Sequence, residues 1–164
     1  MSCQMSPHVE IERKFLIPTL PQDLERFPCS RIEQGYVAID AAGIEVRIRR
    51  RRERTSLTIK GGSGRSRAEE EIEIDAPRFA RLWALSGGRC LEKTRYEIPA
   101  DGGLTIELDV YRGRLEKLAT AEVEFASLEA AERFVAPPWF GKEVTDDDAY
   151  KNRRLAVDGR PADT

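Results

Sequence analysis

Apolar and charged residues alternate with a period of two along most of this chain, from Val9-Glu10-Ile11-Glu12 onward. This period is typical of β-strands whose two faces differ chemically. Glycine-rich turns such as Asp101-Gly102-Gly103 separate several of the alternating segments, as hairpin loops do. The pattern predicts strands at residues 8–16, 31–39, 43–51, 54–61, 67–75, 90–98, 104–111 and 118–126. A set of short strands of this kind indicates an antiparallel sheet or barrel.

Helical spacing of apolar residues interrupts the strand pattern in three places. The first predicted helix starts at Asp75-Ala76-Pro77, with proline in its first turn. The second runs from Ser127, as its N-terminal cap, to the break at Pro137-Pro138. The third opens at Thr145, where aspartates precede a basic stretch in the order that the helix dipole favours. Because we find no repeat or linker, we expect residues 1–164 to form a single α+β domain.

Each predicted strand has a charged face and an apolar face. The charged positions of one parity are Glu10, Glu12, Lys14, Arg47, Arg49, Lys60, Arg67, Glu69, Glu71, Glu73, Lys93, Arg95, Glu107, Asp109, Glu122 and Glu124. On a single strand of an open sheet, such charges are normally just solvated. For the whole set this interpretation is weaker, because acidic pairs cluster on some strands and basic pairs on others, with like charges about 6.6 Å apart.

Closing the sheet would explain the charged faces and would leave an apolar surface for the helices to cover. We therefore predict a closed eight-stranded antiparallel β-barrel, a tunnel with a charged lumen and with helices packed on the outside. Paired glutamates supply the oxygen ligands that Mg²⁺ or Mn²⁺ prefers. Arginine and lysine complement phosphate oxygens, so a metal-bound polyphosphate is the ligand that would use both kinds of side chain.

The amino-acid composition limits the kinds of partner that we expect for this protein. Lys plus Arg number 27 and Asp plus Glu 29, a net charge of −2, which gives no argument for a nucleic acid or a membrane surface as partner. Arg50, Arg51 and Arg52 are accordingly interpreted as a solvated strand end. The cysteines, Cys3, Cys29 and Cys90, lack metal-ligand spacing, and no apolar run approaches the roughly 20 residues that cross a bilayer. We expect a cytoplasmic protein.

The run from Val9 to Leu16 resembles the N-terminal Glu-x-Glu-x-Lys strand of the triphosphate tunnel metalloenzymes, the CYTH superfamily. Further matches follow in the family's order: Gln34-Gly35-Tyr36, Val46-Arg47-Ile48-Arg49, Leu57-Thr58-Ile59-Lys60, Arg67-x-Glu69-x-Glu71, Glu92-Lys93-Thr94-Arg95-Tyr96, Glu107-Leu108-Asp109-Val110, Glu122-Val123-Glu124-Phe125 and Gly141-Lys142-Glu143-Val144-Thr145. The resemblance covers about residues 8–157. The chain looks most similar to the compact bacterial members, which hydrolyse inorganic tripolyphosphate.

The resemblance implies a role for each matching residue. The principal Mg²⁺ or Mn²⁺ ion would be held by Glu10, Glu12, Glu122 and Glu124. A second ion or its waters would be held by Glu69, Glu71 and Asp109. The phosphates would be gripped by Lys14, Arg47, Arg49, Lys60, Lys93 and Arg95. Lys60 with Tyr36 would form a catalytic pair in which the lysine acts as base; the alternative is that Tyr36 is a packing residue with its hydroxyl bonded elsewhere.

Other functions remain open at this point. An adenylate cyclase, a thiamine triphosphatase or a nucleoside triphosphatase would share the fold, but each needs an apolar slot, and we identify no inward aromatic residue beyond Tyr36. A non-catalytic polyphosphate-binding module could discard the metal-binding glutamates, which are all present here. The preferred prediction is a metal-dependent tripolyphosphatase whose partner is a small triphosphate; a homodimer is left open.

Overall fold

The computed structural model describes residues 11–41, 43–61 and 68–162. It contains the predicted strands as β1 (Ile11–Leu16), β2 (Cys29–Ile39), β3 (Glu45–Arg51), β4 (Arg54–Gly61), β5 (Ala68–Glu73), β6 (Cys90–Pro99), β7 (Thr105–Tyr111) and β8 (Ala119–Phe125). They form one eight-stranded sheet in the order β1-β8-β7-β6-β2-β3-β4-β5, and every pairing is antiparallel. The antiparallel sheet is confirmed. Glu10, Arg67 and Cys3 lie outside the described residues.

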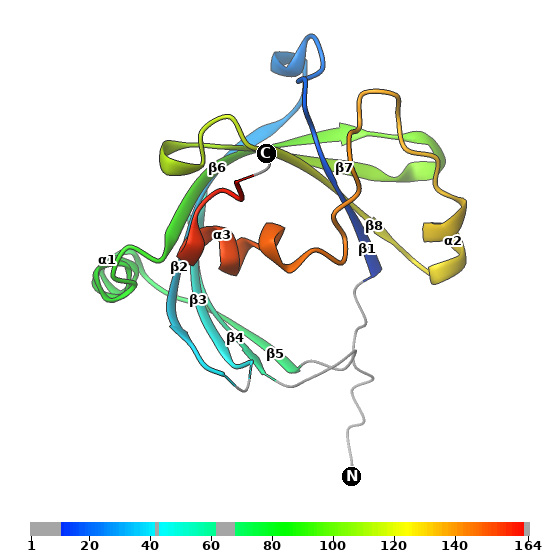
Figure 1. The fold of residues 1–164 in the computed structure, drawn as a ribbon. Helices are drawn as coiled ribbons and strands as arrows, with labels where there is room; N and C mark the ends of the chain where they lie inside the picture. Colours follow the sequence, from blue (N-terminus) through cyan, green and yellow to red (C-terminus); the bar gives the residue numbers. More distant parts are fainter. Residues whose placement is uncertain (1–10, 42, 62–67, 163–164) are drawn as a thin grey trace.

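The strands curl into an incomplete ring (Figure 1), and among the described residues no hydrogen bonds close it. Within the described ranges no pairing joins β1 to β5, so the predicted closed barrel is not confirmed. The outer edge of β1 is used by another segment. The amide of Leu16 donates to Lys142 O at 2.8 Å, and the amide of Val144 donates to Lys14 O at 2.8 Å. This pairing occupies the backbone groups of β1 that barrel closure would need.

The glycine at the start of this edge segment, Gly141, has no room for a side chain. A Cβ there would lie 2.9 Å from Leu16 O and 2.9 Å from Pro18 Cδ. We expect Gly141→Ala to lower the free energy of unfolding by about 1–3 kcal/mol, because the segment must move off β1. Thermal and urea unfolding measure this. Gly61→Ala is the control, since its nearest atom is Ile44 Cγ1 at 3.9 Å; equal losses in both variants would contradict the prediction.

Two of the helices begin where the sequence predicts. Helix α1 (Ala76–Leu85) is capped by Asp75, whose side chain accepts from the Arg78 amide. Helix α2 (Leu128–Arg133) is capped by Ser127, which accepts from the Ala130 amide. Short 3₁₀ helices lie at η1 (Leu24–Arg26), η2 (Asp101–Gly103), η3 (Gly113–Leu115) and η4 (Asp148–Tyr150). Within the part of the chain that the structure describes, no helix is long and apolar enough to cross a membrane.

The predicted start of the third helix is wrong. Helix α3 covers Asn152–Asp158, whereas Thr145 precedes a single 3₁₀ turn, η4. The Asp147 side chain accepts from the Ala149 amide and closes that turn locally, and Lys151 then adopts an extended conformation. Asp147 therefore caps a short turn and not a long helix.

The apolar residues form two cores, one on each side of the sheet. On the convex side, Phe15, Val123 and Phe125 pack with the aromatic residues Phe134 and Phe140. On the concave side, a second core is formed by Tyr36, Leu91, Tyr111, Leu115, Leu118, Val144, Tyr150, Leu155 and Ala156. Helices α1 and α2 lie outside the curve as predicted, but α3 lies within it (Figure 1). The prediction that the helices pack on the outside is thus wrong for α3, because Leu155 and Ala156 are apolar and find their partners inside.

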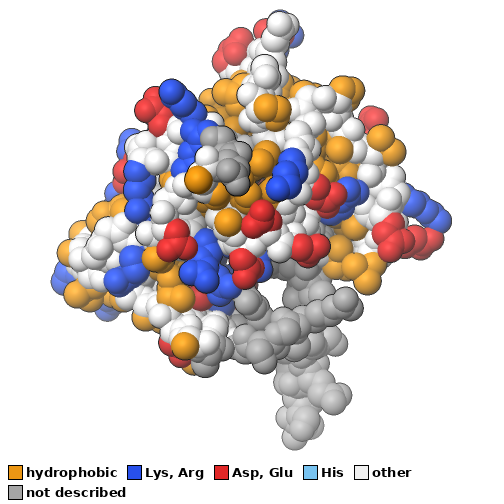
Figure 2. All heavy atoms as spheres, in the orientation of Figure 1, with side chains coloured by type: hydrophobic (Ala, Val, Ile, Leu, Met, Phe, Trp, Pro, Cys, Tyr) orange, Lys and Arg blue, Asp and Glu red, His pale blue; other side chains and the backbone are white. Residues whose placement is uncertain are grey.

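The outer surface carries both signs of charge. On the face shown in Figure 2, acidic and basic side chains are interleaved with apolar ones. This distribution matches the net charge of −2. The segregation of charge that the sequence predicts is found on the concave side of the sheet.

Candidate active site

The charged strand faces line a cavity of about 380 Å³ on the concave side of the sheet. Its described lining consists of Glu12, Ile32, Gln34, Arg47, Arg49, Arg51, Lys60, Glu69, Lys93, Arg95, Glu107, Glu122, Glu124 and Asn152. Cavities of this size hold small ligands in other proteins. Most of the predicted site residues are in this lining, and Lys14 and Asp109 are buried directly behind it. Glu71 lies in the adjoining opening at the β3–β4 end.

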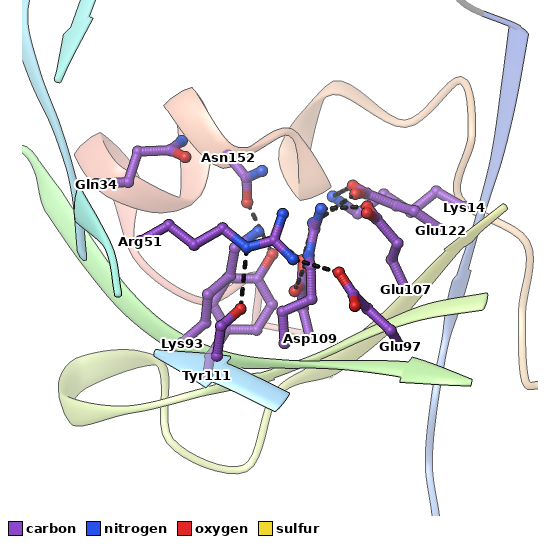
Figure 3. A network of polar contacts seen from close by, with 12 residues as sticks. Lys14, Gln34, Arg51, Lys93, Glu97, Glu107, Asp109, Tyr111, Glu122 and Asn152 are labelled. Carbon is purple, nitrogen blue, oxygen red and sulfur yellow. Dashed lines mark hydrogen bonds and ion pairs between the residues drawn. The ribbon is translucent and has the colours of Figure 1, made fainter. Parts of the chain in front are cut away.

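A first network of ion pairs joins β1, β6, β7 and β8, and we call it the buried network (Figure 3). Lys14 Nζ lies 2.9 Å from Glu122 Oε1, and Arg95 Nη2 lies 3.0 Å from Glu122 Oε2. Asp109 is 0% exposed and receives Arg95 at 2.6 Å and Lys93 at 2.5 Å. Arg95 also pairs with Glu107. The register explains this contact set, since Arg95 lies opposite Asp109 and Lys14 lies opposite Glu122 on neighbouring strands.

The acidic and basic side chains of the buried network stabilise one another in their ionised forms. Burial alone would raise the pKa of Asp109 and of Glu122. Lys93 and Arg95 nevertheless hold the pKa of Asp109 below its usual range. The pKa of Glu122 is held below its usual range by Lys14, Lys93 and Arg95. Burial alone would lower the pKa of Lys14, but Tyr111 and Glu122 raise it overall. Asp109, Glu122 and Lys14 are therefore ionised at neutral pH, and each needs its partner.

These shifts give a pH dependence of stability with a definite sign. A carboxylate whose pKa is lowered by folding stabilises the protein above its unfolded pKa, about 4, and this stabilisation is lost as the pH falls further. We expect the melting temperature of the wild type to fall steeply below about pH 4. We expect Asp109→Asn to melt lower at pH 7 and to show a flatter acid limb. Thermal unfolding between pH 7 and pH 2.5 measures both, and parallel acid limbs would show that Asp109 contributes little.

A second network joins β3, β4 and β5. Lys60 Nζ lies 2.8 Å from Glu69, Arg49 lies 3.3 Å from Glu71, and Arg47 lies 3.7 Å from Glu69. Thr58 links Arg47 to Glu71, because its hydroxyl accepts from Arg47 at 3.2 Å and donates to Glu71 at 3.1 Å. Arg47 Nε is buried and has no hydrogen-bond partner among the described residues. An unpaired, buried guanidinium donor beside a cavity favours an anionic ligand.

Carboxylates also face one another across strands near the cavity. Glu12 lies opposite Glu124 on β1 and β8, and Glu107 lies opposite Glu122 on β7 and β8. These four glutamates line both the cavity and an adjoining opening beside β7 and β8. Like charges placed directly opposite each other are destabilising unless a cation lies close to them. The donor set is thus one of hard oxygen ligands in a polar site, which fits a divalent cation.

The comparison with known proteins shows the family of this chain. No protein-family model matches the chain. A protein of Nitrosomonas europaea, named inorganic triphosphatase, is 46% identical over 149 residues, which cover 90% of this chain and 97% of the relative. The chain belongs to the inorganic triphosphatases of the CYTH superfamily.

Solved structures show the same family fold. The crystal structure of the inorganic triphosphatase NE1496 is similar with a TM-score of 0.74 and 42% identity, covering 90% of this chain and 94% of that one. HpAC1 from Hippeastrum is similar with a TM-score of 0.56 and 19% identity, covering 75% of this chain and 82% of that one, and it shares the fold alone. The cavity of this triphosphatase family member therefore lies in a fold that both solved structures share.

The metal set of this CYTH protein stays a prediction. No three His, Cys, Asp or Glu side chains of the described part of the chain are grouped closely enough to hold a metal ion. Glu10, the remaining predicted ligand, is outside that part. Glu122 is meanwhile bound by Lys14 and Arg95, so it would have to exchange partners to ligate a cation.

The predicted catalytic pair is also bonded elsewhere in this structure. Tyr36 is 3% exposed, and its hydroxyl accepts from Gln34 Nε2 at 2.8 Å. Burial raises the pKa of Tyr36, so the phenol stays protonated at neutral pH. Lys60 pairs with Glu69, and no hydrogen bond joins Tyr36 to Lys60 among the residues that the structure describes. Tyr36 has the contacts of the packing alternative, and its catalytic role stays a prediction.

Sequence reasoning missed several residues of this triphosphatase cavity. The sequence predicts a solvated Arg51, but this side chain lines the cavity, donates to Ser30 Oγ at 3.0 Å and pairs with Glu97. Its parity with Arg47 and Arg49 was the available signal. Arg50 does face outward, 4.3 Å from the centre of the Phe79 ring. Gln34 and Asn152 were missed because an uncharged side chain does not mark a charged face.

Proposed function

We propose that this chain hydrolyses inorganic tripolyphosphate with the help of Mg²⁺ or Mn²⁺ bound by the cavity glutamates. The observation that carries the proposal is the relative named inorganic triphosphatase, which this chain matches over 97% of its length. The cavity supports it, because cations and carboxylates face the same small space from two networks. Water would add across one phosphoanhydride bond, giving pyrophosphate and phosphate.

The proposed roles follow the two networks. Arg47, Arg49 and Lys60 would hold the phosphates from the β3–β4 side, and Lys14, Lys93 and Arg95 would hold them from the opposite side. Fixed cations on both sides position the chain and stabilise charge that develops in the transition state. A divalent cation at Glu12, Glu122 and Glu124, with Glu10, would neutralise phosphate oxygens and lower the pKa of a bound water.

The competing substrates each carry an organic group. An adenosine or thiamine moiety needs apolar or aromatic surface, and Ile32 is the only apolar residue in the described lining. This polar lining favours the inorganic substrate over an adenylate cyclase or thiamine triphosphatase function. Cytoplasmic location and a homodimer stay predictions.

The decisive test is product analysis with several substrates. Tripolyphosphate, pyrophosphate, ATP and thiamine triphosphate are each incubated with Mg²⁺, Mn²⁺ or EDTA, and phosphate, pyrophosphate and cyclic AMP are quantified. We expect fast cleavage of tripolyphosphate in the presence of metal and none with EDTA. Cyclic AMP from ATP would establish the cyclase instead. Tight binding of tripolyphosphate without turnover under any metal would leave the binding module.

A further inference from the structure

Asn152, the first residue of α3, lines the cavity from a helix on the concave side of the sheet. Its Oδ1 accepts a hydrogen bond of 2.8 Å from the hydroxyl of Tyr111, a β7 residue that is 2% exposed. Figure 3 shows Asn152 hanging from α3 toward Tyr111 and Lys93. The ring of Tyr111 also lies 5.5 Å from Lys93 Nζ. Asn152 is thereby placed beside a predicted phosphate-binding lysine.

The hydrogen bond from Tyr111 fixes which end of the amide is available. Because Oδ1 is bonded to the tyrosine, the donor group Nδ2 is left for the cavity. Among the described residues, the hydrogen bond found for the Asn152 side chain is the one that Oδ1 accepts from Tyr111. Asn152 therefore lines the cavity with N–H donors that Tyr111 does not occupy, and the chemistry of the cavity favours phosphate oxygens.

The helix that carries Asn152 is fixed in place. Arg153 Nη1 lies 3.1 Å from Glu45 Oε1 on β3, and the pair is 20% and 8% exposed. Arg114 donates to the carbonyl oxygens of Leu155 and Ala156 at the other end of α3. Leu155 is 0% exposed in the concave core. These contacts hold the amide of Asn152 at a defined position relative to the cavity.

A neutral donor differs from the cations around it in one respect. Each predicted phosphate-binding cation is already paired with a carboxylate, as Lys93 is with Asp109 and Lys60 with Glu69. Those cations must give up part of an ion pair to bind phosphate, whereas Asn152 keeps its hydrogen bond with Tyr111 when Nδ2 donates to phosphate. A donor that is oriented before the ligand arrives costs no reorganisation when it is used.

We propose that Asn152 is a substrate-binding residue whose Nδ2 donates to an oxygen of the phosphate group held by Lys93. The proposal rests on the proposed function. It adds a neutral donor from α3 to a site whose other predicted contacts come from the strands. Tyr111 acts through Asn152 and is a positioning residue.

The variant N152D tests the proposal with little change of shape. It keeps an oxygen that accepts from Tyr111 and replaces the donor by a negatively charged oxygen beside Lys93. We expect the KM for tripolyphosphate to rise by about tenfold or more, because a hydrogen bond to a charged group is lost and repulsion is gained. The melting temperature is expected to stay within about 2 °C of wild type. The rise of melting temperature that tripolyphosphate causes in the wild type should shrink in N152D.

Two further variants separate binding from a purely structural role. Y111F keeps the Asn152 amide but removes the hydrogen bond that orients it, and we expect a smaller effect, a rise in KM of about threefold. R153Q weakens the link of α3 to Glu45 and should lower the melting temperature with a smaller change in KM than N152D. A KM and kcat of N152D equal to those of the wild type would overturn the proposal. A melting temperature of N152D as low as that of R153Q would also overturn it, because lost stability would then account for the lost activity. If the wild type itself neither cleaves nor binds tripolyphosphate, the proposed function fails first.

Discussion

Glu122→Gln is expected to lower kcat for tripolyphosphate by about 100-fold or more and to destabilise the protein as well. The glutamine cannot supply the charge that Lys14 and Arg95 both contact, at 2.9 Å and 3.0 Å. Breaking a buried ion pair by removing one partner costs about 3 kcal/mol or more, because the other charge stays buried. The loss of a proposed metal ligand adds to the kinetic effect. Steady-state kinetics and urea unfolding measure the two effects separately.

A matched control for this variant lies on the outer surface. Glu33→Gln removes the partner of Arg50, 3.1 Å away, in a pair that is 23% and 38% exposed. Pairs of this exposure contribute about 0–1 kcal/mol, so stability and turnover should change little. If Glu122→Gln and Glu33→Gln both retain wild-type turnover, Glu122 has no part in the reaction and the assigned metal site is wrong.

Metal and triphosphate are expected to bind cooperatively, with an affinity coupling of about 10- to 100-fold. In the structure the cations and carboxylates of the cavity neutralise one another, as Lys14 and Glu122 do. Tripolyphosphate alone would take the cations and leave buried carboxylates without partners, and a divalent cation alone would do the reverse. When both bind, every charge exchanges one partner for another.

This coupling is measured with an imido analogue of tripolyphosphate, which is not hydrolysed. Calorimetric titration of the analogue, in EDTA and at fixed free Mg²⁺, gives the two dissociation constants once the complex of Mg²⁺ with the analogue in solution is taken into account. Equal constants would contradict partner exchange. Lys60→Gln should reduce the affinity for the analogue in both conditions, because it removes a cation from the second network.

The strand pattern was predictable because burial on one face of a strand imposes a period of two on the sequence. The same period located the charged lining, and it also identifies Arg51 once the parity of Arg47 and Arg49 is extended. Local patterns say nothing about which edge a distant segment will pair with. The pairing of Val144 with Lys14, which replaces barrel closure at β1, was therefore not predictable.

The role of α3 was hidden for a similar reason. Consecutive aspartates favour a helix N-terminus locally, yet Asp147 bonds within a short turn, and α3 starts only at Asn152. Its position inside the curve depends on the apolar partners of Leu155, which come from distant strands. A neutral asparagine has no signature in a pattern of charges, so its place in the cavity emerges only in three dimensions.

The occupied edge of β1 leaves β5 as the edge strand of the sheet whose pairing, among the described residues, is with β4 alone. A free edge can pair with the same edge of another molecule and begin aggregation. On β5 the side chains of Glu69, Glu71 and Glu73 share one face, so an antiparallel pair of β5 strands would bring glutamates together. This repulsion weakens as salt screens it. Raising the ionic strength should therefore promote association of the protein in concentrated solution.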